Sequence, residues 1–390
     1  MTEFRSGQGN DSFWTWRKLM YAFLEHLTPE HMYAINCFVQ MEMMEAGYAS
    51  LGEFHYIHHQ TDGSHYSNVA EMANTVTDAA CQSGIGLTLL PVFYEQGGVD
   101  GRPLTDGQLR FGNTTDTYDK LWEQARNYGD SAISDFHLGI APHSLRATSL
   151  SSLGHLVKNY TNVPVHIHIA EQIAEIEEIE NAFGARPVEW LMEQTDVDSR
   201  WCLVHATHLS EFEVDALAQS GAIAGLCPVT EANLGDGIFP CVDFLSKGGA
   251  IGVGTDSNIS VSFVHELRML EYSQRLHHRQ RAMLSTNNQS TGRTLFDAAI
   301  TGGAQAVGRK TGKIATGYLA DFISLDNAHI DLLSLENDYI LDSWIFASKD
   351  ELIKDVISAG RHMVKDGQHV KRNDFRQLFH KTIRELRNLI

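Results

Sequence analysis

The segment "VHIHIAEQ" (residues 165–172) alternates apolar and polar side chains as far as Ile169, which is the pattern of a β-strand. It ends in Glu171, a carboxylate three residues after His168. Histidines and a glutamate at the end of a strand indicate either a metal site or an ordinary polar rim. The rest of the chain decides between these two interpretations.

Short apolar runs alternate with amphipathic stretches along most of the chain, which is typical of parallel βα units. Seven runs are expected to be barrel strands: residues 48–57, 85–94, 136–143, 163–171, 201–208, 222–228 and 250–257. A closed (β/α)8 barrel needs eight strands. The segment before residue 48 has a helical pattern, and nothing in residues 1–12 resembles a strand. We therefore expect an α/β fold of the TIM-barrel type whose first strand is missing.

The pattern changes after residue 310, where short alternating runs are separated by glycine turns. We expect a barrel over residues 1–310 and a small β-domain, the C-terminal part of a β-sandwich, over residues 311–372. The last segment, residues 373–390, has the pattern of an amphipathic helix.

Composition limits the partners and the compartment. With 30 basic and 49 acidic residues the net charge is −19, which argues against nucleic acid or an anionic membrane as the main partner. The five cysteines are widely spaced and form no C-x-x-C pair, as in a reducing compartment. No secretory signal and no apolar run long enough to span a bilayer is found. We expect a soluble, cytoplasmic protein.

The predicted strands end in polar residues, and in a barrel of this type the chemistry lies at the carboxyl ends of the strands. These residues are His55, Tyr56, His58, His59, His143, Arg146, His168, Glu171, His205, His208 and Asp256. One such residue is usually a satisfied polar group. Five strand ends of the same character favour a functional site.

His168 has the chemistry of a metal ligand, since neutral imidazole binds zinc or iron well; the alternative is a rim histidine bonded to a backbone carbonyl. Glu171 faces the same mouth and can carry a proton from water to a leaving nitrogen, although alone it would be interpreted as a helix-capping residue. His205 can polarise a substrate atom or share in proton transfer, or it is a core histidine. Asp256 can bind the metal, or it closes the strand in an Asx-turn.

Other polar residues of these strands are expected to be structural. His166 has the parity of His168 and is placed one layer deeper in the barrel, while His208 is interpreted as a loop or capping residue. Cys202 and Cys227 lie on predicted strands and are expected to pack rather than to bind metal.

Several motifs together carry a family resemblance. They are "DSFWTWRKLMY" (11–21), "LGEFHYIHH" (51–59), "APHSLRAT" (141–148), "HIHIAEQ" (166–172), "WCLVHATH" (201–208), "GTDSNIS" (254–260) and "GKIATGYLADFISLD" (312–326). The set resembles the one-metal deaminase branch of the amidohydrolase superfamily and, more narrowly, the formimidoylglutamate deiminase family. The resemblance runs over nearly the whole chain, and the combination is far more specific than any single motif.

The resemblance implies that N-formimino-L-glutamate is hydrolysed to N-formyl-L-glutamate and ammonia, a step of histidine degradation. It implies that His168 and Asp256 bind one divalent metal ion, normally zinc. Glu171, His205 and Asp256 become the catalytic residues. Arg17, Tyr56, His143 and Arg146 match positions that hold the glutamate moiety, in keeping with the cations and donors that a dicarboxylate needs. Whether the protein forms a homodimer is left open.

One departure from the family affects these expectations. The superfamily carries a metal-binding H-x-H pair on its first barrel strand, and no such pair precedes Asp11. We expect either a start codon assigned downstream of the true one or a gene that has lost its 5′ end, and therefore little activity from a chain that begins at Met1. The alternatives are a deaminase of the same superfamily that acts on a purine or aminated ring, and a truncated remnant without catalysis.

Overall fold

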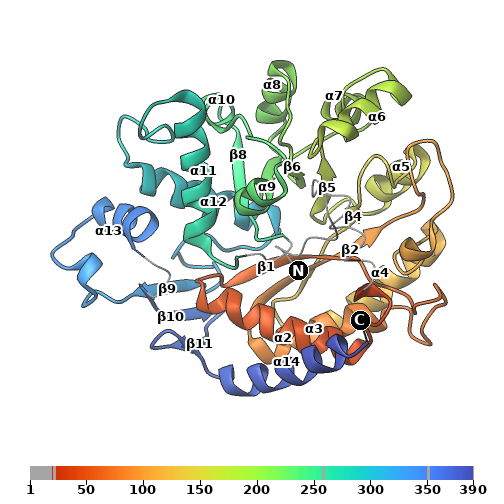
Figure 1. Ribbon diagram of the computed structural model, residues 1–390, viewed down its shortest axis with the longest axis horizontal. Coiled ribbons are helices and arrows are strands. Elements are labelled where there is room, and N and C mark those ends of the chain that lie inside the picture. The colour runs from red at the N-terminus through yellow and green to blue at the C-terminus, as the bar shows by residue number, and fades with distance from the viewer. Residues whose placement is uncertain (1–19, 21–22, 257–259, 349–351, 390) are drawn as a thin grey trace.

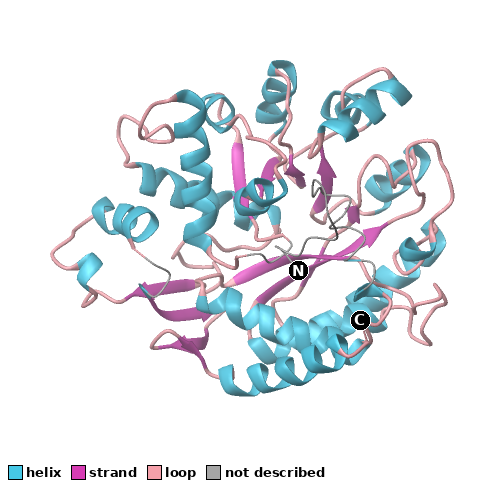
Figure 2. Cartoon of the chain, in the orientation of Figure 1, coloured by secondary structure: helices cyan, strands magenta, loops and turns pink. Residues whose placement is uncertain are grey.

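A computed structural model of the protein describes residues 20, 23–256, 260–348 and 352–389 (Figure 1). Short parallel strands line the centre, and helices surround them (Figure 2). The parallel strands are β1 (Ser50–His55), β2 (Gly86–Phe93), β3 (His137–Leu138), β4 (Ala141–Pro142), β5 (Val165–Ile169), β6 (Trp201–His205), β7 (Ile223–Leu226) and β8 (Ala250–Val253).

These strands follow one another in barrel order. β1 pairs with β2, which pairs with both β3 and β4, and β5 to β8 pair in sequence. A bridge between Ile140 and Val165 joins the two sets. The amides of His166 and His168 also donate to the carbonyls of Ile140 and His143. The protein therefore has the mixed α/β, TIM-barrel architecture that the sequence predicted.

The predicted strand 136–143 is divided into β3 and β4 at Gly139. A Cβ atom at this position would lie 2.5 Å from Leu90 Cδ2 and 2.7 Å from the carbonyl oxygen of Pro164. The indole of Trp122 donates to the Gly139 carbonyl at 2.9 Å. Because the neighbouring strands approach so closely, only glycine fits, and the ladder is interrupted there.

The two ends of the parallel sheet are β1 and β8. Within the described residues, β1 pairs only with β2 and β8 only with β7. Helix α2 (Pro29–Glu45) precedes β1, and the described residues before it contain no strand. The expectation that the first strand of the barrel is missing is not tested by these residues and stays a prediction.

The helices lie outside the strands (Figure 1). After α2 they are α3 (Glu71–Ser83), α4 (Thr115–Ala132), α5 (Leu150–Asn159), α6 (Ile173–Phe183), α7 (Pro187–Gln194), α8 (Glu211–Ser220), α9 (Pro228–Leu234), α10 (Cys241–Ser246), α11 (Phe263–His278) and α12 (Thr291–Ala306), with a 3₁₀ turn, η1 (Asp106–Gln108). In the described part of the chain, no helix combines the length and the apolar character that crossing a membrane requires.

A second, antiparallel sheet follows the barrel in the order β12-β11-β10-β9. Its strands are β9 (Phe322–Leu325), β10 (Ile353–Ser358), β11 (Arg361–Lys365) and β12 (Gln368–His369). Helix α14 (Arg372–Arg387) comes next and packs on α2, where the rings of Phe38 and Phe379 stack with centroids 4.0 Å apart. The division of the chain at residues 310 and 372 stays a prediction.

The region between β9 and β10 contains short helices, which the sequence did not predict. It contains η2 (Ile330–Leu332), α13 (Asp338–Asp342) and the π-helical η3 (Ser343–Ala347). Each piece is too short to show a helical period. The segment is held by contacts to the barrel helices: Arg268 donates to the carbonyl of Ile345 at 2.7 Å, and the amide of Gly292 donates to Asp342 at 2.7 Å.

A buried carboxylate joins the antiparallel sheet to the amino end of the barrel. Asp135, just before β3, lies 2.6 Å from a guanidinium nitrogen of Arg309 and 2.6 Å from one of Arg361, which belongs to β11. Arg361 also donates to the carbonyl of Gly84 at 3.0 Å. Burial raises the pKa of Asp135, but the hydrogen bonds from the two arginines outweigh it and lower that pKa to about 2.

We predict that Asp135→Asn lowers the free energy of unfolding by about 3–5 kcal/mol near neutral pH, because it leaves the fully buried Arg309 without its counter-charge. The folded pKa lies below the unfolded value of about 3.9. The contribution of Asp135 is therefore present above about pH 4 and is lost as the pH falls toward 2. Denaturant unfolding of both proteins between pH 7 and the lowest pH at which they still fold measures the effect.

The matched control is Asp130→Asn. Asp130 pairs with Arg126 at 3.3 Å, and both side chains are about half exposed, so removing this pair is expected to change the stability by less than about 1 kcal/mol. Equal losses of unfolding free energy in the two variants would contradict the assigned role of Asp135. A difference in unfolding free energy between wild type and Asp135→Asn that does not narrow at acidic pH would also contradict it.

Candidate active site

The carboxyl ends of β4, β5 and β6 bring three histidines together. The imidazole centroid of His168 lies 5.1 Å from that of His143 and 5.6 Å from that of His205. The register between β5 and β6 places Ile169 opposite His205. Since parallel strands end on the same edge, residues far apart in the sequence meet here, as predicted.

His168 has the hydrogen bonding of a metal ligand. Its Nδ1 lies 3.1 Å from the carbonyl oxygen of His143 and donates to it, so Nε2 carries the lone pair. Nε2 lies 3.5 Å from the hydroxyl of Tyr56. Burial and the charge of His205 lower the pKa of His168 to about 3. The ring is therefore neutral near pH 7, the form that binds a metal ion.

The second histidine of the "HIH" motif has a different role. His166 lies deeper in the barrel, where its Nε2 is 2.8 Å from the carbonyl oxygen of Ala306. Burial lowers the pKa of His166 to about 4. This is the structural role that strand parity predicted for it.

Glu171, His205 and Glu231 form a line of two carboxylates with an imidazole between them. Nε2 of His205 lies 3.7 Å from Oε1 of Glu171, and Nδ1 lies 3.3 Å from Oε1 of Glu231. Burial acts to lower the pKa of His205, but the charge of Glu171 and the hydrogen bond to Glu231 raise it to about 10. The imidazole therefore carries a positive charge next to Glu171 near neutral pH, which suits a polarising role.

The backbone is strained where these strands end. Ala170, His205, Ala206 and Asp256 have φ angles of 52°, 67°, 47° and 43°, in the left-handed region that costs a non-glycine residue about 1–3 kcal/mol. Such strain persists only where the surrounding structure fixes the conformation, and it is typical of functional sites.

Asp256 lies in the same mouth, just after β8. Its side chain is exposed, and its charge contributes to raising the pKa values of Tyr56, His205 and Cys227. These three side chains belong to the ends of different strands. The Asp256 carboxylate therefore acts on the centre of the site.

Two further residues predicted to bind substrate are in contact with this mouth. His143 lies with its ring centroid 5.5 Å from Tyr56, and its Nδ1 is 2.9 Å from the hydroxyl of Ser144. Burial raises the pKa of Tyr56 well above its ordinary value.

Arg146 approaches the same residues. Its positive charge acts to lower the pKa values of Tyr56 and His168. The Arg146 Nε atom is buried and has no hydrogen-bond partner among the described residues. Arg17 lies outside the described residues.

The other histidines at the end of β1 do not join this group. Nε2 of His58 lies 2.8 Å from the carbonyl oxygen of Val92, and Nε2 of His59 lies 2.7 Å from that of Gly112. His55 is buried beside His58, with ring centroids 5.2 Å apart. Since Phe54 and Tyr56 face the site, the strand alternation turns His55 the other way.

Sequence reasoning missed the acidic residues that follow β7. Burial and the charge of Glu171 raise the pKa of Asp236 to about 8. Glu231 was also missed. Its signal in the sequence was "CPVTE" (227–231), a proline at the start of a helix and an acidic residue three positions later, at a strand end.

This donor set fits a divalent cation. His168 offers a neutral imidazole, and Asp256 a carboxylate in the same mouth. Several acidic side chains lie within electrostatic reach of one another, and their mutual repulsion contributes to the raised pKa of Asp236. A bound cation offsets such repulsion.

Known proteins share both the sequence and the fold. The model of the amidohydrolase family matches residues 1–363. Formimidoylglutamate deiminase of Pseudomonas aeruginosa is 47% identical over 383 residues, 98% of this chain and 84% of that protein. A 5-methylthioadenosine/S-adenosylhomocysteine deaminase of Natronomonas pharaonis is 25% identical, over 87% of this chain and 72% of that protein.

Solved structures agree with this. A crystal structure of an amidohydrolase from Brucella melitensis superposes with a TM-score of 0.94 at 46% identity, over 98% of this chain and 84% of that one. An adenosine deaminase from Xanthomonas campestris with bound zinc shares the fold, with a TM-score of 0.80 at 18% identity over 99% of this chain and 83% of that one. The chain belongs to the amidohydrolase family.

Proposed function

We propose that this protein hydrolyses the formimino group of N-formimino-L-glutamate, giving N-formyl-L-glutamate and ammonia. The 47% identity to a formimidoylglutamate deiminase over nearly the whole chain supports this assignment. The observation in the site that carries it is Arg146, whose buried Nε has no hydrogen-bond partner among the described residues. An arginine in a mouth otherwise rich in carboxylates suits a substrate that is itself a dicarboxylate.

The charges of the site complement the two ends of this substrate. A formimino group is an amidine and readily becomes cationic, which suits the acidic side chains of Glu171 and Asp256. The glutamate end carries two carboxylates, which suit Arg146 and, by the family resemblance, Arg17. The net charge of −19 supports a small molecule rather than nucleic acid as the partner.

In the reaction, the oxygen of a water molecule adds to the formimino carbon, and the bond from that carbon to the terminal nitrogen breaks. Glu171 takes a proton from the attacking water and passes it to the departing nitrogen, which leaves as ammonia. His205, held cationic beside Glu171, stabilises the negative charge that develops during the addition. Tyr56 and His143, together with Arg146, hold the glutamate moiety, as the family resemblance implies.

We infer that His168 and Asp256 hold one divalent metal ion, with zinc as the candidate. A zinc-bound relative of the same fold supports this metal. When bound, the ion would lower the pKa of water and polarise the formimino group.

The substrate proposal predicts ammonia release from N-formimino-L-glutamate and hardly any from adenosine or guanine. Arg146→Met is expected to lower kcat/KM. The fall should correspond to a loss of about 2–5 kcal/mol in transition-state binding, because a substrate carboxylate loses its charged partner. Arg126→Met, which removes a surface arginine that pairs with Asp130, is the control and should leave kcat/KM unchanged. Comparable turnover of a purine would sink the assignment.

The assay is run on the protein with its metal content measured. Activity with N-formimino-L-glutamate supports the substrate. Inactivity with the metal bound contradicts it.

The proton-transfer role predicts that Glu171→Gln lowers kcat by about 100-fold or more, the usual worth of a positioned proton carrier. Metal content and substrate affinity should stay close to those of the wild type. Turnover, metal content by elemental analysis and the substrate Kd are measured together. Glu178→Gln, on the helix α6 that follows Glu171, is the control. A Glu171→Gln enzyme with normal turnover would show that Glu171 is only a cap at the strand end.

The metal proposal predicts that a chelator abolishes ammonia release and that added zinc restores it. His168→Ala and Asp256→Asn should each weaken metal binding by more than the about 10- to 100-fold typical of losing an outer hydrogen-bond partner. His166→Gln, deeper on the same strand, should still retain the ion. Equal metal content in His168→Ala and wild type would exclude His168 as a ligand.

A further inference from the structure

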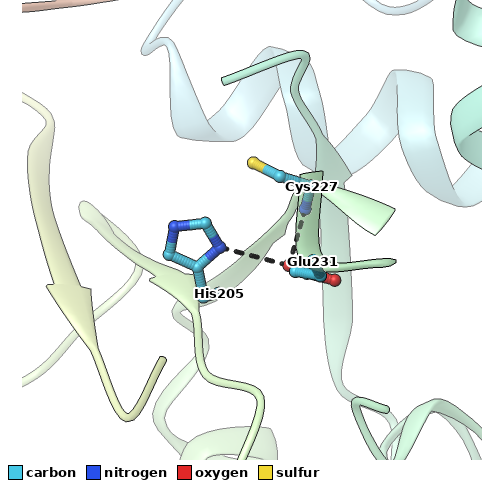
Figure 3. Close-up of side chains that lie close together, drawn as sticks. All are labelled: His205, Cys227 and Glu231. Carbon is cyan, nitrogen blue, oxygen red and sulfur yellow. Dashed lines mark hydrogen bonds and ion pairs between the residues drawn. The ribbon is translucent and has the colours of Figure 1, made fainter. Parts of the chain in front are cut away.

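Glu231 lies behind His205, next to Nδ1 and thus across the imidazole ring from Glu171. It belongs to α9, the helix that follows β7, and only 4% of its surface is exposed. Its Oε1 atom accepts hydrogen bonds from Nδ1 of His205 at 3.3 Å and from the amide of Cys227 at 2.8 Å (Figure 3).

The position of this carboxylate is fixed by the backbone rather than by His205. Cys227 is the residue before the first turn of α9, and Pro228 follows it. The side chain of Glu231, the fourth residue of the helix, reaches back to the amide of Cys227, one of the backbone donors at the start of a helix that lack a partner within the helix. Glu266 of α11 accepts the amide of Val229 at 2.9 Å in the same turn. Both carboxylates anchor α9, but only Glu231 reaches the histidine.

His205 needs such a partner because its backbone leaves the strand conformation. His205 and Ala206 are consecutive left-handed residues, with φ angles of 67° and 47°. The Ala206 amide is held by the carbonyls of Ile169 and Val204, each at 3.0 Å. The turn aims the imidazole across the mouth toward β7, and the hydrogen bond to Glu231 then determines how the ring is rotated.

We propose that Glu231 is a positioning residue that fixes the rotation of the His205 ring, so that its Nδ1–H group points toward α9 and Nε2 faces Glu171. The inference rests on the proposed function for the catalytic role of His205. A charged acceptor behind a histidine orients the ring and stabilises its cationic form, so the effect should appear in turnover.

The rival interpretation is a metal site. Ligand atoms of His205, Cys227 and Glu231 lie within 4.8 Å of one another. However, Oε1 of Glu231 already accepts two hydrogen bonds, and burial raises the pKa of the Cys227 thiol well above its ordinary value, against the thiolate that a metal needs. The hydrogen bonds account for the arrangement without an ion.

The experiment compares Glu231→Gln with Glu266→Gln in the metal-loaded enzyme. Glutamine keeps an acceptor oxygen and the shape of the side chain but removes the charge. We expect Glu231→Gln to lower kcat by about 10- to 100-fold with little change in KM, because Glu231 lies behind His205 and away from the substrate. Glu266→Gln should leave kcat unchanged. Melting temperatures of both variants report any loss that comes only from a loosened helix.

A second measurement does not depend on turnover. With ¹⁵N-labelled histidine, the wild type should show a hydrogen-bonded Nδ1 proton that is absent from His205→Asn and altered in Glu231→Gln but not in Glu266→Gln. If the protein shows the hydrogen-bonded Nδ1 proton of His205 but is inactive toward N-formimino-L-glutamate, the proposed substrate is refuted and the positioning role of Glu231 is still supported. Normal kcat in Glu231→Gln, equal loss in both variants, or a cobalt–thiolate absorption band removed by Cys227→Ser would each overturn the proposal.

Discussion

The parallel register between β5 and β6 is the constraint on which the site depends. It places His168 beside Val204 and Ile169 beside His205. In regular strands this register would turn the two imidazoles to opposite faces of the sheet. The left-handed conformation of His205 turns its imidazole back, so that its ring centroid lies 5.6 Å from that of His168. Strand pairing and this backbone turn together set the geometry of the site.

Electrostatics at the mouth works against folding. Glu171, Glu231 and Asp236 are all buried there, and each charge makes the next harder to keep ionised, as the raised pKa of Asp236 shows. The cationic His205 partly balances them. A buried surplus of negative charge is costly in an isolated fold, and it makes sense only where a positive species is bound during the working cycle. A metal ion and an amidinium-like substrate both have that property.

The sequence predicted the elements whose pattern is local. Alternation and strand ends brought His168, Glu171 and His205 into one group, and parity alone separated His166 from His168. It failed where a side chain depends on distant or irregular backbone. Glu231 reaches His205 only because of the turn after β6, and Asp135 meets Arg309 and Arg361 across 174 and 226 residues of chain. The sequence also placed His55, His58 and His59 with the polar strand ends. A run of histidines does not show which of them bond to backbone carbonyls, as His58 and His59 do.

The Asp135 cluster lies at the amino ends of the barrel strands, opposite the mouth that holds His168. The stabilising ion-pair cluster and the candidate active site therefore lie at opposite ends of the barrel. Substitutions near His168 can change substrate specificity without weakening the Asp135 cluster that connects the barrel to the antiparallel sheet. A more stable cluster can in turn offset the destabilising substitutions that new specificity often requires. Because the two regions are separate, substrate specificity can change during evolution with little loss of stability.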